Sequence, residues 1–124
     1  GDITPVQIRL MLVEQDAINF ALALRDLMPA IERSLAVEDS GETRALVGVG
    51  FLLATCDVGR DCSSESFNYL RGCAFEGQCQ GSVMARLTEG LTPTQVEQVQ
   101  RYRERIGAAY RAKDYGFFGA GLAR

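Results

Sequence analysis

Residues 42–55, ETRALVGVGFLLAT, decide the fold that we predict for this chain. A helix formed by this stretch carries apolar side chains on every side, so other elements have to cover it all round. We therefore place it at the centre of the fold, with Asp39 or Ser40 as its N-cap. Gly48 and Gly50 each weaken such a helix by about 1 kcal/mol, and we expect them to permit close approach of a neighbouring helix.

A long amphipathic stretch precedes this central helix. Thr4, Pro5 and Gln7 have the spacing of an N-cap, a first-turn proline and a capping-box partner, so a helix is expected to begin there. Because Pro29 has no amide hydrogen to donate back along the helix, we expect a kink or a break near Met28. Apolar residues recur every three or four positions, which places them on one side of the helix. They are Val6, Leu10, Val13, Ala17, Phe20, Leu24, Leu27, Ile31 and Leu35.

A second helix of the same kind is expected near the C-terminus. Thr92, Pro93 and Gln95 repeat the opening signature of the first helix. The apolar stripe that follows predicts a helix that continues to about Ala112. The stripe comprises Val96, Val99, Tyr102, Ile106, Ala109 and Tyr110.

The remaining segments complete an all-α fold. We expect two short helices, over about residues 64–72 and 81–89, and Gly90 supplies a stop signal for the second. Residues 114–124 are rich in glycine and aromatic side chains and are expected to be irregular. No stretch shows the period-two alternation of a strand. The prediction is a single domain, residues 1–124, built as a compact bundle of about five helices.

Four cysteines form the most specific motif of the sequence. Cys56 and Cys62 are six residues apart, and so are Cys73 and Cys79. If residues 64–72 are helical, Cys62 and Cys73 lie about 16 Å apart at 1.5 Å per residue. A disulfide needs Cα atoms within roughly 7 Å. We therefore expect two local disulfides, Cys56–Cys62 and Cys73–Cys79, that staple two corners between helices, while Cys56–Cys73 with Cys62–Cys79 stays open.

Structural disulfides predict an oxidising compartment, so we expect an exported protein that is periplasmic or secreted. Zinc is disfavoured, because zinc sites use cysteines two to four residues apart and this chain has no histidine to add. Thiol redox chemistry is disfavoured too, since it usually needs Cys-x-x-Cys. We expect neither a metal nor a cofactor.

The cysteine segment also carries a resemblance to a known group of proteins. Its motifs are Cys-Asp-x-Gly-x-Asp-Cys-Ser from Cys56 and Cys-Ala with a closing Gly-x-Cys from Cys73. In these motifs the chain resembles uncharacterised exported helical proteins with cysteines from Xanthomonas-like gammaproteobacteria. The resemblance implies export, and it implies no activity, because the group has none assigned.

Composition limits the classes of function. The net charge of −3 argues against nucleic acid, which requires a basic surface. No stretch reaches the roughly 18 apolar residues that a membrane span needs. The absence of histidine removes the usual general base and the Ser-His and Cys-His nucleophile pairs. Only a pair of carboxylates is left as a route to hydrolysis, so we expect a protein without catalytic residues.

Two groups of apolar residues are candidates for an interface with a partner. Met11, Ile18 and Leu22 form a second, thinner stripe on the first helix, which is explained either by packing inside the domain or by a contact surface for a second copy or a foreign protein. The aromatic residues of the tail are explained by packing on their own domain, by disorder or by a docking arm. They are Tyr115, Phe117 and Phe118.

One interhelical ion pair is expected. Asp16 and Arg103 each border an apolar helix face, so we predict that they pair between the first and last helices. For function, the leading hypothesis is an exported helical domain that binds another macromolecule. The alternative is a carrier of a small apolar ligand near Phe20, Phe51 and Tyr102. A third option, a hydrolase, requires two acids that converge in one cleft.

Overall fold

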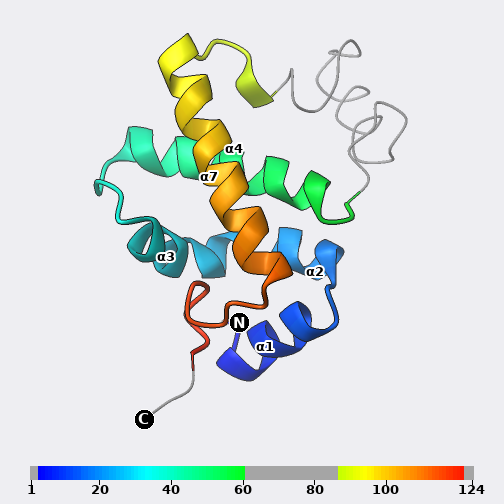
Figure 1. Ribbon diagram of the computed structural model, residues 1–124. Helices are drawn as coiled ribbons and strands as arrows, with labels where there is room; N and C mark the ends of the chain where they lie inside the picture. Colours follow the sequence, from blue (N-terminus) through cyan, green and yellow to red (C-terminus); the bar gives the residue numbers. More distant parts are fainter. Residues whose placement is uncertain (1–2, 61–86, 122–124) are drawn as a thin grey trace.

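The computed structural model describes residues 3–60 and 87–121, and these residues form five helices and no strand (Figure 1). The all-α fold class is therefore confirmed for this part of the chain. The helices are α1 (Pro5–Val13), α2 (Ala17–Leu22), α3 (Leu24–Leu35), α4 (Gly41–Asp57) and α7 (Pro93–Arg111). The predicted helix over residues 64–72 and most of the one over 81–89 lie outside the described residues, as do Cys62, Cys73 and Cys79.

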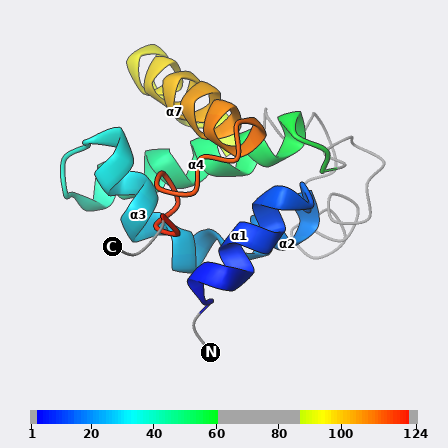
Figure 2. The same cartoon turned by 60° about the horizontal axis from the view of Figure 1, so that its bottom comes forward.

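The helix predicted from residues 42–55 is the centre of the fold. It extends from Gly41 to Asp57, and the Ser40 hydroxyl caps it by accepting a hydrogen bond from the Thr43 amide at 3.1 Å. Figure 2 shows α7 on one side of α4 and the three N-terminal helices on the other. The buried residues of α4, which include Val47 and Phe51, come from several sides of the helix, as an all-round apolar sequence requires.

The close approach expected at a glycine is confirmed at Gly50. A Cβ atom added there would lie 2.8 Å from the Tyr102 Cβ atom and 3.1 Å from the Val99 carbonyl oxygen, both of which belong to α7. At Gly48 the nearest neighbour is the flexible end of Met28, at an ordinary 3.8 Å. Of these two glycines, Gly50 is therefore the one that permits the close approach of α7 to α4.

The expectation of one long first helix is wrong, and the helix does not break near Met28. The chain breaks at residues 14–16, where Gln15 adopts a left-handed φ of 52°, and again at Ala23, between α2 and α3. Asp16 then starts α2, because its carboxylate accepts a hydrogen bond from the Asn19 amide at 3.1 Å. Pro29 lies inside α3 and does not end it.

This break changes which residues of α1 are buried. Ile8, Met11 and Leu12 turn inward and are at most 6% exposed. Periodicity had placed Val6 and Leu10 on the buried side, but both are exposed. A stripe extrapolated through residues 14–16 as one continuous helix therefore assigns the wrong face to α1.

Phe20 is at the middle of an aromatic core. Its ring centroid lies 4.8 Å from that of Phe51, 4.4 Å from that of Tyr110 and 5.3 Å from that of Phe118. All four side chains are at most 1% exposed. The Tyr110 hydroxyl is buried and has no hydrogen-bond partner among the described residues, and burial raises the pKa of this side chain. α2 is thereby joined to α4, α7 and the C-terminal segment.

The segment after α7 folds back over α1 and α3 (Figure 1). The Ser34 hydroxyl donates to the Phe117 carbonyl oxygen at 2.8 Å, and the Arg9 guanidinium donates to the carbonyl oxygens of Ala120 and Gly121 at 2.9 and 3.0 Å. These contacts fix the path of the irregular segment that the sequence predicted.

The helix ends predicted from local signals agree with the structure. Complete capping boxes join Thr4 with Gln7 and Thr92 with Gln95. Gly90 has a left-handed φ of +82°, as its role as a stop signal requires. Local hydrogen bonding thus fixes these ends.

Candidate functional site

The exposed large apolar side chains of the described residues all belong to α1 and α2. A surface helix ordinarily turns such side chains toward the core, and a cluster of them on one surface is typical of an interaction site. They are Val6 (61% exposed), Leu10 (52%), Val13 (51%), Ile18 (70%) and Leu22 (77%).

Two of these residues line the same pocket, which we call the α1–α2 pocket. Leu10 of α1 and Leu22 of α2 contribute to a pocket of about 600 Å³. Met11, only 5% exposed, contributes a buried wall. Val6 and Val13 lie about one turn before and after Leu10, so the apolar surface continues along α1 beyond the pocket. The other lining residues are Ile3, Gln7, Asp16, Asn19, Ala23 and Asp26.

The ionisable residues of the α1–α2 pocket are acidic. They are Asp16 and Asp26, and none of the described lining residues is basic. Hydrogen bonds from the Asn19 backbone amide, and then from its side chain, lower the pKa of Asp16, so this carboxylate stays ionised. The pocket therefore combines apolar walls with negative charge.

The structure separates the three residues predicted as a contact surface. Ile18 and Leu22 are exposed, whereas Met11 is in the core and has little surface to offer a partner. Sequence reasoning missed Leu10 because it treated α1 and α2 as one helix. The signal that was available is Asp16, an N-cap residue directly before an apolar run.

Of the three explanations for the C-terminal aromatic residues, packing on their own domain is the one that agrees with the structure. Phe117 is 9% exposed and Phe118 is 1% exposed, and their rings contact each other at 5.0 Å. Tyr115 is partly buried against the same core. Phe117 and Phe118 therefore have little exposed surface to offer a partner.

The predicted ion pair has the wrong partner. Arg103 pairs with Asp57, not with Asp16: its Nε and Nη2 atoms donate to the two carboxylate oxygens at 2.6 Å each. These bonds, from α7 to the last residue of α4, hold the pKa of Asp57 below its usual range. The pairing arises because α7 crosses α4 at Gly50, which brings these two residues together.

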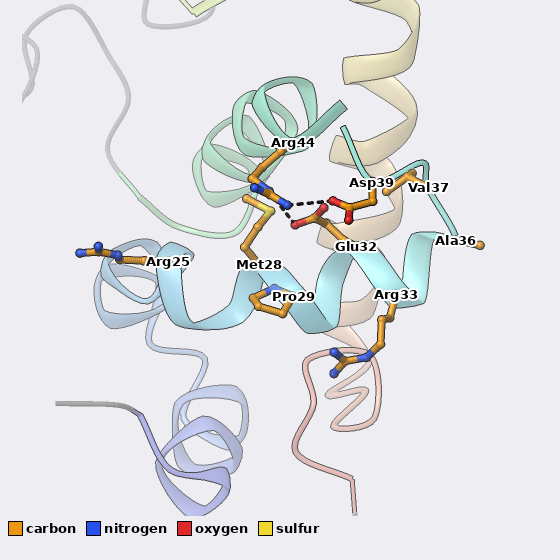
Figure 3. A pocket seen from close by; sticks show the side chains of 9 residues that line it. All are labelled: Arg25, Met28, Pro29, Glu32, Arg33, Ala36, Val37, Asp39 and Arg44. Carbon is orange, nitrogen blue, oxygen red and sulfur yellow. Dashed lines mark hydrogen bonds and ion pairs between the residues drawn. The ribbon is translucent and has the colours of Figure 1, made fainter. Parts of the chain in front are cut away.

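A second pocket lies along α3 and shares no lining residue with the α1–α2 pocket. This α3 pocket has a volume of about 640 Å³ and is lined by α3, the following loop and the start of α4 (Figure 3). Arg44 donates to Glu32 at 3.3 Å and to Asp39 at 3.0 Å, as the dashed lines show. The remaining lining residues are Arg25, Met28, Pro29, Arg33, Ala36 and Val37.

The residues considered for the alternative functions are placed as follows. Phe20 and Phe51, expected near a small apolar ligand, pack directly on each other in the core, and both described pockets lie elsewhere. Residues 3–60 and 87–121 contain no group of three acidic or cysteine side chains arranged to hold a metal. Asp16 and Asp26 line one pocket, and hydrogen bonds from Asn19 lower the pKa of Asp16.

Comparison with known proteins adds no relative. No family model matches the chain, and neither a curated protein nor a solved structure shows significant similarity to it. Among the described helices, none is both long enough and apolar enough to cross a membrane.

Proposed function

We propose that this chain is an exported helical domain without catalytic residues that binds another protein through the α1–α2 pocket. The observation that supports this most is the exposure of Leu10 of α1 and Leu22 of α2, which both line one pocket. Keeping two leucines in water is unfavourable by about 25 cal/mol for each Å² of apolar surface. Coverage by a partner removes that cost.

The chemistry of the pocket favours an amphipathic helix as the bound segment. Such a helix places apolar side chains at intervals of three or four residues, which suits the separated apolar walls of the pocket. Asp16 and Asp26 favour lysine or arginine beside those apolar residues and disfavour acidic ones. The proposed partner therefore presents a basic amphipathic helix.

A photo-crosslinking amino acid at Leu22 tests this binding. The modified protein is mixed with extract of the cells that produce it and irradiated. We expect a covalent product that forms at position 22 and not when the same amino acid replaces Thr94, an exposed residue of α7. A product made only of this chain would identify a second copy as the partner.

A charge variant provides the matched control. Leu10→Arg adds a positive charge to the pocket wall and should reduce the crosslinked product at least about tenfold, because it repels the basic partner helix and removes an apolar contact. Ala108→Arg adds the same charge to an exposed site on α7 and should leave the product unchanged. Equal products from both variants, or from positions 22 and 94, would contradict the proposal.

Export and disulfide bonding are part of the same proposal. Cys56 is the one cysteine among the described residues, and its proposed partner Cys62 lies outside them. The resemblance of the cysteine segment to exported bacterial proteins points in the same direction. The pairing that we propose is Cys56–Cys62 with Cys73–Cys79, which joins residues near in sequence and needs little chain ordering.

Alkylation of the protein as purified from its host measures the state of the thiols. We expect no labelling before reduction and four labelled cysteines afterwards, in agreement with the count in the sequence. Digestion without reduction should yield peptides in which Cys56 is linked to Cys62 and Cys73 to Cys79. Labelling of all four cysteines before reduction would refute both the disulfides and the argument for export.

A further inference from the structure

The α3 pocket differs in charge from the rest of the protein. The chain as a whole has a net charge of −3, whereas this pocket is lined by three arginines and two acids. Arg44 is occupied by both acids, Glu32 and Asp39. The positive charge that remains belongs to Arg25 and Arg33.

Arg25 and Arg33 have no ion pair and no side-chain hydrogen bond with any described residue. Both are exposed, and Figure 3 shows them extending from opposite ends of the pocket, with Pro29 between them. The three positions follow one another at intervals of four residues along α3, so each arginine is about 6 Å along the axis from Pro29. Side chains four residues apart on a helix can meet. In Figure 3 the Arg25 side chain points away from Pro29 and the Arg33 side chain lies on the side of α3 opposite Met28. Because both side chains are exposed, each can change rotamer and turn toward one anion beside Pro29.

The wall next to this position is apolar. Met28 and Val37 are partly buried and pack against the main core, and Pro29 contributes its ring. In Figure 3, Met28 lies between α3 and Arg44. The bonds from Arg44 to Glu32 and Asp39 hold the Arg44 guanidinium against α3 and the loop. An apolar chain that starts above Pro29 can lie along Met28 and Val37.

We propose that the α3 pocket binds a small amphipathic carboxylate, with Arg25 and Arg33 on the carboxylate and Met28, Pro29 and Val37 on the apolar chain. Arginine suits this role because its planar guanidinium matches a carboxylate with two parallel hydrogen bonds. The volume of about 640 Å³ is in the range of ligand pockets and fits a chain of moderate length. This site is separate from the α1–α2 pocket and does not depend on the proposed protein partner.

Titration with octanoate, followed by NMR of the backbone amides, tests the proposal. We expect saturable shifts centred on residues 25–37, with octanol and acetate each binding at least about tenfold more weakly. Octanol lacks the charge and acetate lacks the apolar chain, so the two controls separate both halves of the site. Equal binding of octanol, shifts centred on α1 and α2, or no saturation by octanoate would each overturn the proposal.

Variants assign the binding to the two arginines. The double change Arg25→Gln and Arg33→Gln is expected to weaken octanoate binding at least about tenfold. The fold should persist, because both residues are exposed. Arg101→Gln removes an exposed arginine of α7 that is outside the pocket and should leave binding unchanged. A loss of binding that is the same in Arg101→Gln would show a general charge effect and overturn the assignment.

Discussion

Replacing Gly50 by alanine is expected to destabilise the protein by about 2 kcal/mol, although alanine is the better helix former. The added methyl group would lie 2.8 Å from the Tyr102 Cβ atom and 3.2 Å from the Arg103 amide nitrogen. Neither atom can move without the α7 backbone, so α4 and α7 have to separate. The free energy of unfolding from urea denaturation measures the loss.

Gly48→Ala is the matched control for this change. It makes the same substitution in the same helix, but its new methyl group meets only the flexible end of Met28 at 3.8 Å. Helix propensity alone then predicts a gain of up to about 1 kcal/mol. If the two variants had the same stability, the crossing of α4 and α7 at Gly50 would be wrong.

Phe20→Ala is expected to cost about 3–5 kcal/mol, the range for removing a large buried aromatic side chain. The ring is fully buried and contacts the rings of Phe51, Tyr110 and Phe118. Since proteins of this size are stable by only about 5–15 kcal/mol, this loss is a large part of the free energy of unfolding. Urea denaturation and the loss of near-ultraviolet circular dichroism measure the effect.

Tyr110→Phe separates the ring contacts from the polar group. It keeps the ring 4.4 Å from Phe20 and removes a buried hydroxyl that has no hydrogen-bond partner within residues 3–60 and 87–121. Because that hydroxyl lost its water on folding without replacement, its removal should leave stability unchanged or raise it by about 1 kcal/mol. A large loss in Tyr110→Phe, or a loss below about 1 kcal/mol in Phe20→Ala, would argue against this core.

Phe20 also connects the core to the proposed binding surface. It belongs to α2, the short helix that carries Ile18 and Leu22. A six-residue helix is not stable alone, so its outward side chains keep their place only while its inward one is packed. Changes to the pocket should therefore be compared at equal fractions of folded protein.

The features that could be predicted from the sequence are those encoded by neighbouring residues. Thr4 with Gln7, Thr92 with Gln95 and the hydroxyl of Ser40 each satisfy a helix end within three positions. These signals give the correct helix starts because no distant residue takes part in them. The all-round apolar character of residues 42–55 likewise gives the centre of the fold directly.

The break between α1 and α2 could not be read in the same way. Gln15 adopts its left-handed conformation while its side chain donates to the Leu12 carbonyl oxygen at 2.6 Å and to the Tyr110 carbonyl oxygen at 3.0 Å. The second bond joins residues 95 positions apart. Periodicity therefore assigned Leu10 to the core, and the α1–α2 pocket was only partly anticipated through Leu22.

Ion pairs and pockets that form where helices cross could not be predicted from local sequence patterns either. Arg103 was recognised as an arginine that borders an apolar face, but Asp57 becomes its partner only through the packing of α7 on α4. The α3 pocket combines side chains of α3, the loop at Asp39 and Arg44 of α4. Neither arrangement has a fixed sequence spacing.

The contacts of α1 with the C-terminal segment have a consequence for the order of folding. α1 is translated before the other helices, yet Arg9 finds its acceptor in Ala120, 111 residues later. A contact of such separation requires closure of a long loop, and it slows folding compared with local contacts. The first helix therefore reaches its final position only after translation of the last helix is complete.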